Sequence, residues 1–150
     1  MSSVSMPMAD RATAALMQAG HAVLDARIVD YVARSGHPGI RRAHGRVFEH
    51  LVHHDGLRAV DIAALAGLSP QTIMELVDDL ERLGYVERRP DPADRRAKRI
   101  FLTTKGKRAV AASAEIVRTI EAELRELLGE HYVTLRQALL AVLGETQLSR

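Results

Sequence analysis

Hydrophobic residues recur at alternating spacings of four and three along the first part of the chain. This spacing places side chains on one face of an α-helix, and it predicts a helix over about residues 9–34. The "SGHPG" segment at 35–39 ends this helix, because Gly and Pro do not continue a helix at low cost. The predicted stripe consists of Met17, His21, Leu24, Ile28 and Tyr31.

The same spacing returns after this turn and predicts a second helix over about residues 40–54. The "DG" dipeptide at 55–56 closes it. In this stripe, as in the first, histidine occupies positions where a hydrophobic residue is expected. The second stripe consists of Ile40, His44, Val47, Leu51 and His54.

Two further helices are separated by a glycine. The first covers about residues 60–66, and Gly67 after it permits a left-handed turn. Ser69 is a suitable N-cap for the next helix, and Pro70 takes its first position, where the missing N–H costs nothing. Gly84 ends that helix, and together the two helices describe a helix-turn-helix. Its predicted buried face consists of Ile73, Leu76, Val77 and Leu80.

After this point the period changes from helical to extended. The segments "YVERR" and "AKRIFLT" predict two short strands, and "PDPAD" between them supplies Pro and Asp for a turn. Thr103 or Thr104 then caps a final helical region that runs to about residue 147, which Gly129 divides. The expected fold is therefore mainly α with a small β-hairpin (α+β), a winged helix-turn-helix with flanking N- and C-terminal helices.

Charge is concentrated on the predicted wing. The net charge of the 150 residues is only +2. Residues 82–108, however, contain ten Lys or Arg and three acids, whereas the rest of the chain has eleven basic and sixteen acidic residues. A concentrated basic segment on an acidic body is typical of a directional anion binder, although a solvated charged surface would give the same composition.

Several classes of protein are disfavoured by the same sequence. No cysteine is present, which excludes disulfides and thiolate chemistry. The N-terminal "MSSVSMPMADR" is not a secretory signal, and the longest apolar runs are too short to cross a bilayer, so we expect a cytoplasmic protein without membrane partners. No nucleophile elbow, phosphate-binding loop, zinc-protease motif or dinucleotide fingerprint occurs. We therefore expect neither an enzyme nor a cofactor.

A basic wing beside a recognition helix lies near the DNA backbone when that helix enters the major groove. Arg95, Arg96 and Lys98, together with Arg99, are positioned to neutralise phosphates. Asp94, two residues from Arg96, is expected to hold its guanidinium in a fixed orientation. A solvated hairpin without DNA contact is the alternative.

The unbroken run "LSPQTIMELVDDLERLGYVERRPDPADRRAKRIFLTTKG" at 68–106 resembles the MarR family of bacterial winged helix-turn-helix regulators. The "DPADRR" wing followed by "LTTKG" carries most of this resemblance. It implies one domain over residues 1–150, with a DNA-binding core at about 57–106. It also implies a homodimer built from the helical regions at about 9–54 and 104–147, and control of transcription, commonly repression relieved by a small ligand.

The resemblance assigns roles by position. Ser69, Gln71 and Thr72 lie at the exposed start of the recognition helix, where Gln can pair with adenine and the hydroxyls can reach bases or phosphates. Asp94 and Arg96 match the family's wing pair, with Arg96 expected in the minor groove. The two-fold symmetry implies pseudo-palindromic half-sites about one helical turn apart.

The recognition helix departs from the family pattern after its first turn. Met74-Glu75 stands where many members have a hydroxyl residue followed by arginine. Glu75 is a candidate to accept from cytosine N4, whereas Asp78 and Asp79 are expected to face solvent or the arginines of the wing. An acidic recognition helix leaves a second hypothesis open, a winged-helix module that binds proteins and has little affinity for DNA.

The seven histidines suggest two further sites. His50, His53 and His54 could bind a metal in a metal-responsive regulator, but a structural zinc site needs about four ligands, and surface histidines are the simpler interpretation. His21 and His44 could border a pocket for an anionic or aromatic effector. Alternatively, each is a core histidine whose ring has a hydrogen-bond partner.

Overall fold

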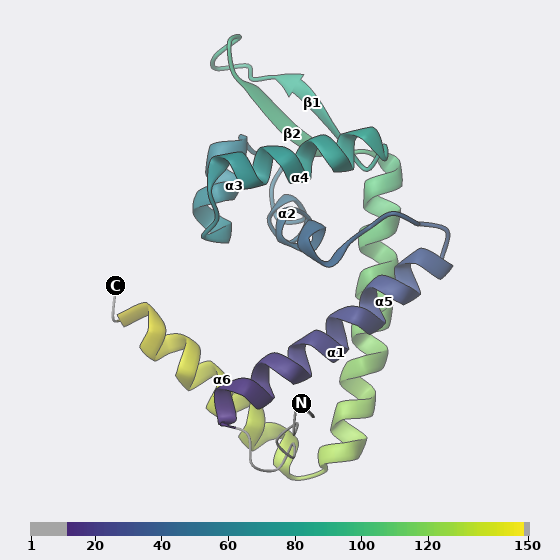
Figure 1. Ribbon diagram of the computed structural model, residues 1–150, viewed down its shortest axis with the longest axis vertical. Coiled ribbons are helices and arrows are strands. Elements are labelled where there is room, and N and C mark those ends of the chain that lie inside the picture. Colours follow the sequence, from purple (N-terminus) through teal and green to yellow (C-terminus); the bar gives the residue numbers. More distant parts are fainter. Residues whose placement is uncertain (1–11, 149–150) are drawn as a thin grey trace, which may run out of the picture. The chain divides into compact units, whose positions relative to one another are not determined.

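The computed structural model describes residues 12–148, with side chains as far as residue 144, and it is drawn in Figure 1. The chain forms two compact units, Met1–Ala114 and Glu115–Arg150. The first unit contains the helix-turn-helix, the wing and the beginning of the long helix that follows them. The predicted start of the first helix at residue 9 lies outside the described residues.

The first two predicted helices are present, and the second is shorter than expected. α1 covers Thr13–Arg34, and a 3-10 turn, η2 (Arg42–His44), leads into α2 (Gly45–Leu51). The N–H groups of His53 and His54 bond to carbonyls three positions back, so the chain after α2 tightens into a turn. The second predicted helix therefore begins later than residue 40, with a 3-10 turn at its start, and its predicted last residues lie in a turn.

The helix-turn-helix is confirmed in detail. α3 (Ala59–Ala66) and α4 (Pro70–Arg82) are bent by 115° relative to each other, and Gly67 between them has a φ of 65° in the left-handed region. The hydroxyl of Ser69 accepts a hydrogen bond from the N–H of Thr72, which satisfies a free donor of the first turn. The predicted inner face of α4 is fully formed by Ile73, Leu76, Val77 and Leu80.

The wing is a two-stranded antiparallel hairpin. β1 (Val86–Pro90) pairs with β2 (Lys98–Leu102), with Val86 opposite Leu102 and Pro90 opposite Lys98. Leu57 adds a bridge to Ile100 on the other edge of β2. Figure 1 shows the hairpin extending away from α4, so its turn is held at a distance from the core.

The junction between the wing and α5 (Thr104–Leu128) fixes where the last part of the chain begins. Thr103 is the capping residue: its hydroxyl accepts from the N–H of Gly106 at 3.0 Å and donates to the carbonyl of Gly84 at 2.7 Å. A Cβ at Gly106 would lie 2.1 Å from the carbonyl oxygen of Tyr85, so the close packing of α5 on this turn requires glycine. Gly129 divides α5 from α6 (His131–Leu148), as predicted.

The core of the first unit lies beneath α4 and the wing. Tyr85 is its largest fully buried side chain, and its hydroxyl donates to the carbonyl of Pro38 at 2.9 Å, so the phenol is satisfied inside an apolar setting. Leu65 of α3, in contrast, lies on the exposed side of its helix. Within the described part of the chain no single helix has the length and hydropathy to span a membrane, although α3 and α4 taken together, despite their bend, pass that test of length and composition.

Candidate nucleic-acid interface

The first turn of α4 presents polar side chains to solvent. Ser69, Gln71 and Thr72 are all exposed, as expected for residues that reach DNA. The hydroxyls of Ser69 and Thr72 lie 2.8 Å apart, so each already has a local partner. The amide of Gln71 donates to the carboxylate of Glu75 over 3.4 Å, one turn further along. Gln71 and Glu75 therefore lie side by side and expose an amide, which can donate and accept hydrogen bonds, next to a carboxylate, which can accept them.

Asp78 is bound by the wing, which confirms one of the two expectations for it. Its carboxylate accepts from the guanidinium of Arg88 on β1 at 2.5 Å, and the same guanidinium also bonds to Glu81. Arg88 is only 16% exposed, so this ion pair is partly shielded from water. Arg88 thus offsets part of the negative charge of Asp78 and Glu81 and links the recognition helix to the wing.

Asp79 does not face the wing or lie free in solvent, and that expectation was wrong. Its carboxylate accepts from the guanidinium of Arg41 at 2.6 Å and lies 3.0 Å from Nε2 of His44, both in the segment before α2. It also bonds to Arg82 on its own helix. These hydrogen bonds, first from Arg41 and then from Arg82, lower the pKa of Asp79 to about 2. The helix is much less acidic toward DNA than its sequence indicates.

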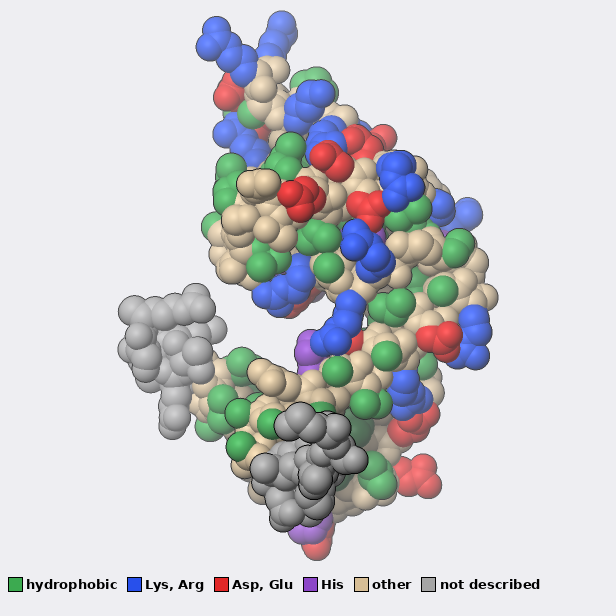
Figure 2. Space-filling model, in the orientation of Figure 1, with side chains coloured by type: hydrophobic (Ala, Val, Ile, Leu, Met, Phe, Trp, Pro, Cys, Tyr) green, Lys and Arg blue, Asp and Glu red, His purple; other side chains and the backbone are tan. Residues whose placement is uncertain are grey.

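The turn of the wing carries exposed cations. Arg95, Arg96 and Lys98 are exposed, and within residues 12–148 their side chains have no ion-pair partner. In Figure 2 Lys and Arg side chains extend from the tip of the hairpin, with acidic side chains gathered below them along α4. Other arginines of the basic segment, such as Arg88 and Arg89, are paired with carboxylates. Three cations without a carboxylate partner in the described part of the chain are therefore gathered at or beside the tip.

Asp94 acts on the backbone of the turn. Its carboxylate accepts from the backbone N–H of Arg96 at 3.0 Å, not from the guanidinium, which corrects the expected contact. An Asp side chain commonly accepts a hydrogen bond from the backbone N–H two residues later, in an Asx-type turn, and Asp94 does so here. The guanidinium of Arg96 is left directed to solvent and available for phosphate or groove contacts.

A contact that the sequence did not reveal supports the base of the wing. Asp91 is 8% exposed and accepts from the guanidinium of Arg58 at 2.6 Å, and its other oxygen accepts from the N–H of Ala93 at 2.9 Å. These bonds, first the one from Ala93 and then the one from Arg58, hold the pKa of Asp91 below its usual value. Because Arg58 is the N-cap residue of α3, this pair fixes the wing relative to the helix-turn-helix.

The two histidines predicted to border an effector pocket have different environments. His44 is completely buried with both ring nitrogens bonded, which is the alternative interpretation of its place in an apolar stripe. The side chain of His21 is 69% exposed on α1 and lies 3.2 Å from Asp25, which also accepts from Arg42 at 2.7 Å. These contacts account for both rings locally, and a role for the pair at an effector pocket stays a prediction.

The neighbouring histidines do not form a metal centre. Within the described residues no group of three or more His, Asp or Glu side chains could hold a metal ion. His53 and His54 are exposed in the turn after α2, and Nδ1 of His54 lies 2.8 Å from the carbonyl of His50. The ring of His54 therefore has a local partner at the end of the helix.

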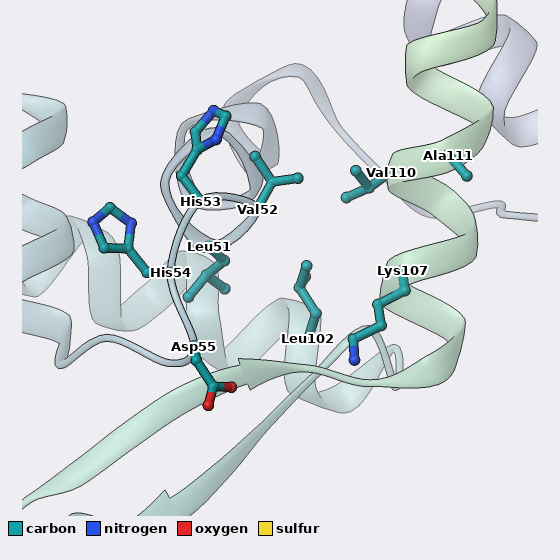
Figure 3. Close-up of a pocket in the computed structure, with 9 residues that line it drawn as sticks. All are labelled: Leu51, Val52, His53, His54, Asp55, Leu102, Lys107, Val110 and Ala111. Carbon is teal, nitrogen blue, oxygen red and sulfur yellow. The ribbon is translucent and has the colours of Figure 1, made fainter.

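An open hollow of about 560 Å³ lies in the first unit beside that turn. Figure 3 shows Val52, Leu102 and Val110 turned toward one another between the end of α2 and the start of α5, with Lys107 and Asp55 below them. The lining thus combines apolar and ionisable side chains. Such a site suits a small amphipathic ligand.

Comparison with protein families agrees with this geometry. Residues 39–97, from the turn before η2 to the tip of the wing, match the model of the MarR family. Among curated proteins, the transcriptional regulator HosA of Escherichia coli O111:H- is 29% identical over 94 residues, covering 62% of this chain and 70% of HosA.

Solved structures extend the similarity over nearly the whole chain. The transcriptional repressor CouR bound to a 23-mer DNA duplex matches with a TM-score of 0.73 and 26% identity, covering 99% of this chain and 100% of CouR. RV1404 from Mycobacterium tuberculosis matches with a TM-score of 0.73 and 25% identity over 95% of this chain and 97% of that one. Wild-type MarR from E. coli, at 22% identity, has a TM-score of 0.71 and shares the fold over 89% of this chain and 98% of its own.

Proposed function

We propose a function from the family of this chain, which belongs to the MarR family of transcription regulators; these are not enzymes. We propose that the protein is a cytoplasmic repressor that binds a pseudo-palindromic duplex operator as a homodimer. The observation that carries this proposal is the pairing of an exposed, capped first turn on α4 with a wing whose free cations lie at its tip. One domain of this kind per half-site would read a major groove and the adjacent minor groove.

The side chains at the start of α4 and at the wing tip suit different parts of the DNA. Gln71 at the start of α4 has the donor and acceptor that pair with adenine in the major groove, and Glu75 beside it can accept from cytosine. Arg96 at the wing tip suits the negative potential of a narrow minor groove. Arg95 and Lys98 add sequence-independent attraction to phosphates.

Dimer formation is supported by apolar side chains that the isolated chain leaves exposed. In the second unit Leu127 is 80% exposed and Leu143 is 61% exposed, although both belong to long helices. Isolated apolar residues on a surface are ordinary, but a helix with several of them requires a partner surface. The remaining exposed apolar residues of α6 are Val133, Leu135, Leu139, Leu140 and Val142.

We also propose that a small anionic ligand with an apolar body occupies the hollow between α2 and α5 and releases the protein from DNA. The apolar side chains of Val52, Leu102 and Val110 would cover the body of the ligand. Lys107, which also lines the hollow, would attract its charge. A ligand at this place would act on the start of α5, which is capped by Thr103 directly after the wing.

Selection from a random duplex library tests the function without knowledge of the operator. The proposal predicts enrichment of a two-fold symmetric sequence that the protein then binds, by fluorescence anisotropy, far more tightly than scrambled duplex. Replacement Arg96→Ala should weaken binding, whereas Arg34→Ala, which removes a paired arginine of α1, should leave it unchanged.

Selection that enriches no sequence, together with equal and weak binding of all duplexes, would contradict the repressor proposal. That outcome favours the protein-interaction module. Such a module would retain the fold and would show no steep loss of DNA affinity as salt is raised.

A further inference from the structure

Two residues far apart in the sequence connect the segment before α2 with the inner flank of the recognition helix. His44 has no exposed surface, and its Nε2 lies 3.0 Å from Oδ2 of Asp79 on α4. Arg41, three residues before His44, donates to the same oxygen at 2.6 Å. This part of α4 is therefore bound to η2 by hydrogen bonds as well as by apolar packing.

The hydrogen bonds define the state of the imidazole. The backbone N–H of Arg41 donates to Nδ1 of His44 at 3.0 Å, so that nitrogen carries no proton. The proton of the neutral ring is then on Nε2, where it is donated to Asp79. Burial, followed by the charge of Arg41, lowers the pKa of His44, and the carboxylate of Asp79 acts in the opposite direction.

The charged groups around the imidazole come from several elements. Arg41 lies in its own segment, and Asp79 with its partner Arg82 lies on α4. On α1, Asp25 binds Arg42 of η2 and contacts His21. The charged residues of α2, Arg46 and Glu49, pair with each other across 3.9 Å. Among the side chains of residues 12–144, Asp79 is the carboxylate that bonds directly to the ring.

Because Asp79 follows Asp78 directly, its contact with His44 helps to fix the rotation of α4 about its axis. Consecutive residues of a helix point about 100° apart, so the two carboxylates leave α4 on different flanks. Asp78 is bound by Arg88 of the wing, and Asp79 is bound by Arg41 and His44. Contacts on two flanks oppose rotation of the helix about its own axis, which a single contact would permit.

We propose that His44 and Asp79 are positioning residues for DNA recognition, which hold α4 at the rotation that presents Gln71 to the major groove, although neither residue touches DNA. This inference rests on the proposed DNA-binding function. Binding groups must be held within a fraction of an ångström and some 10–20° of their productive geometry, and buried hydrogen bonds behind them supply that precision.

Protonation of His44 gives the test a signature that a purely structural role would lack. A proton on Nδ1 would face the backbone N–H of Arg41, and the bond between them would be lost. The imidazolium would also lie beside the Arg41 guanidinium. Discrimination between operator and scrambled duplex should therefore decline as the ring becomes charged.

The experiment measures the affinities for selected operator and for scrambled duplex between about pH 5 and pH 8 at constant ionic strength. Their ratio cancels the general gain of positive charge from other histidines. For the wild type we expect the ratio to fall by about tenfold toward the acidic end. His44→Gln, which keeps a donor toward Asp79 and does not titrate, should give a ratio independent of pH.

Asp79→Asn is the second variant, because it removes the charge and keeps an acceptor oxygen. Loss of the carboxylate removes the group that raises the His44 pKa, so the decline should move to lower pH. Identical profiles in wild type and His44→Gln, or an unmoved decline in Asp79→Asn, would overturn the proposal. So would affinity losses that the unfolded fraction, measured by thermal melting, fully explains.

A wild-type protein that fails to distinguish operator from scrambled duplex at every pH would instead show that the proposed function is wrong. In that case the positioning role falls with it. The two failures are distinguishable, because a wrong positioning role leaves the preference of the wild type for the operator near neutral pH intact, whereas a wrong function removes it.

Discussion

Asp78 on the recognition helix and Arg88 on the first strand of the wing form an ion pair of 2.5 Å, so the two surfaces proposed to contact DNA are joined directly to each other. The pair is partly buried on the arginine side, where Glu81 shares the same guanidinium. In the sequence Arg88 adds to the positive charge of the wing, but in the structure it orients the wing relative to α4.

Replacement of Arg88 tests whether it supports DNA binding by orienting the wing or only through its positive charge. Arg88→Gln should reduce operator affinity by about tenfold or more, because Asp78 and Glu81 would then face the DNA without compensation and the wing would lose its link to α4. Anisotropy titration measures the effect. Arg89→Gln is the matched control on the same strand, since the contacts of Arg89 with Glu87 and the ring of Phe101 stay within the hairpin. An equal loss in both variants would indicate that charge alone is responsible.

The salt dependence of binding reports the phosphate contacts at the tip. In Arg95→Ala the slope of log affinity against log salt concentration should fall by about one, because one phosphate contact is lost, and operator and scrambled duplex should weaken alike. Arg96→Ala should additionally reduce the preference for the operator if Arg96 reads a narrow minor groove. Equal slopes for wild type and both variants would place the wing tip away from DNA.

Close packing at the start of α5 makes one glycine indispensable. Gly106→Ala would bring a methyl group to 2.1 Å from the carbonyl oxygen of Tyr85, within the backbone of the turn after α4. We expect a loss of at least about 1–3 kcal/mol of unfolding free energy, measured by chemical denaturation. Gly20→Ala is the control, because nothing lies within 4 Å of a Cβ there, and it should stabilise α1 by about 0.5–1 kcal/mol.

Acid should destabilise the protein through Asp79. Its folded-state pKa of about 2 lies below the usual value of 3.8, so the stabilisation is complete above pH 3.8 and is lost as the pH falls toward 2. In Asp79→Asn this part of the pH dependence should be absent when unfolding is followed by circular dichroism. An unchanged acid profile would mean that the bond to Arg41 contributes nothing in solution.

Exposed leucines of α6 provide a test of the dimer. Leu140→Glu should produce a monomer at micromolar concentration in light scattering, because a charge would be buried in the interface without a partner. Gln137→Glu adds the same charge at another exposed position of the helix and is expected to remain dimeric. A dimeric Leu140→Glu would exclude this part of α6 from the interface.

The sequence predicted the features that depend on neighbouring residues. The N-cap at Ser69, the left-handed Gly67 and the buried face of α4 each follow from a few consecutive positions, and the structure contains all of them. The end of the second helix was less predictable, because an α-helix and the tighter turn around His53 satisfy the same hydrophobic stripe over a few residues.

The pattern of hydrophobic residues did not predict contacts between segments that are distant in the sequence. Arg58 and Asp91 are 33 residues apart, and His44 and Asp79 are 35 apart, so periodicity contains no sign of either pair. A partial signal existed at Asp79, which flanks the buried positions Val77 and Leu80 on the helix. An acid at such a border requires a partner, and a histidine within an apolar stripe is a fitting one.

A hydroxyl-radical footprint on the selected operator tests the central claim most directly, since it shows both the contact and its symmetry. We predict protection in two equivalent regions whose centres lie about one helical turn, roughly 10 base pairs, apart, each with a flanking minor-groove protection that disappears in Arg96→Ala. A single asymmetric region, or no protection at concentrations that saturate anisotropy, would contradict a dimeric regulator that reads two half-sites with α4 and the wing.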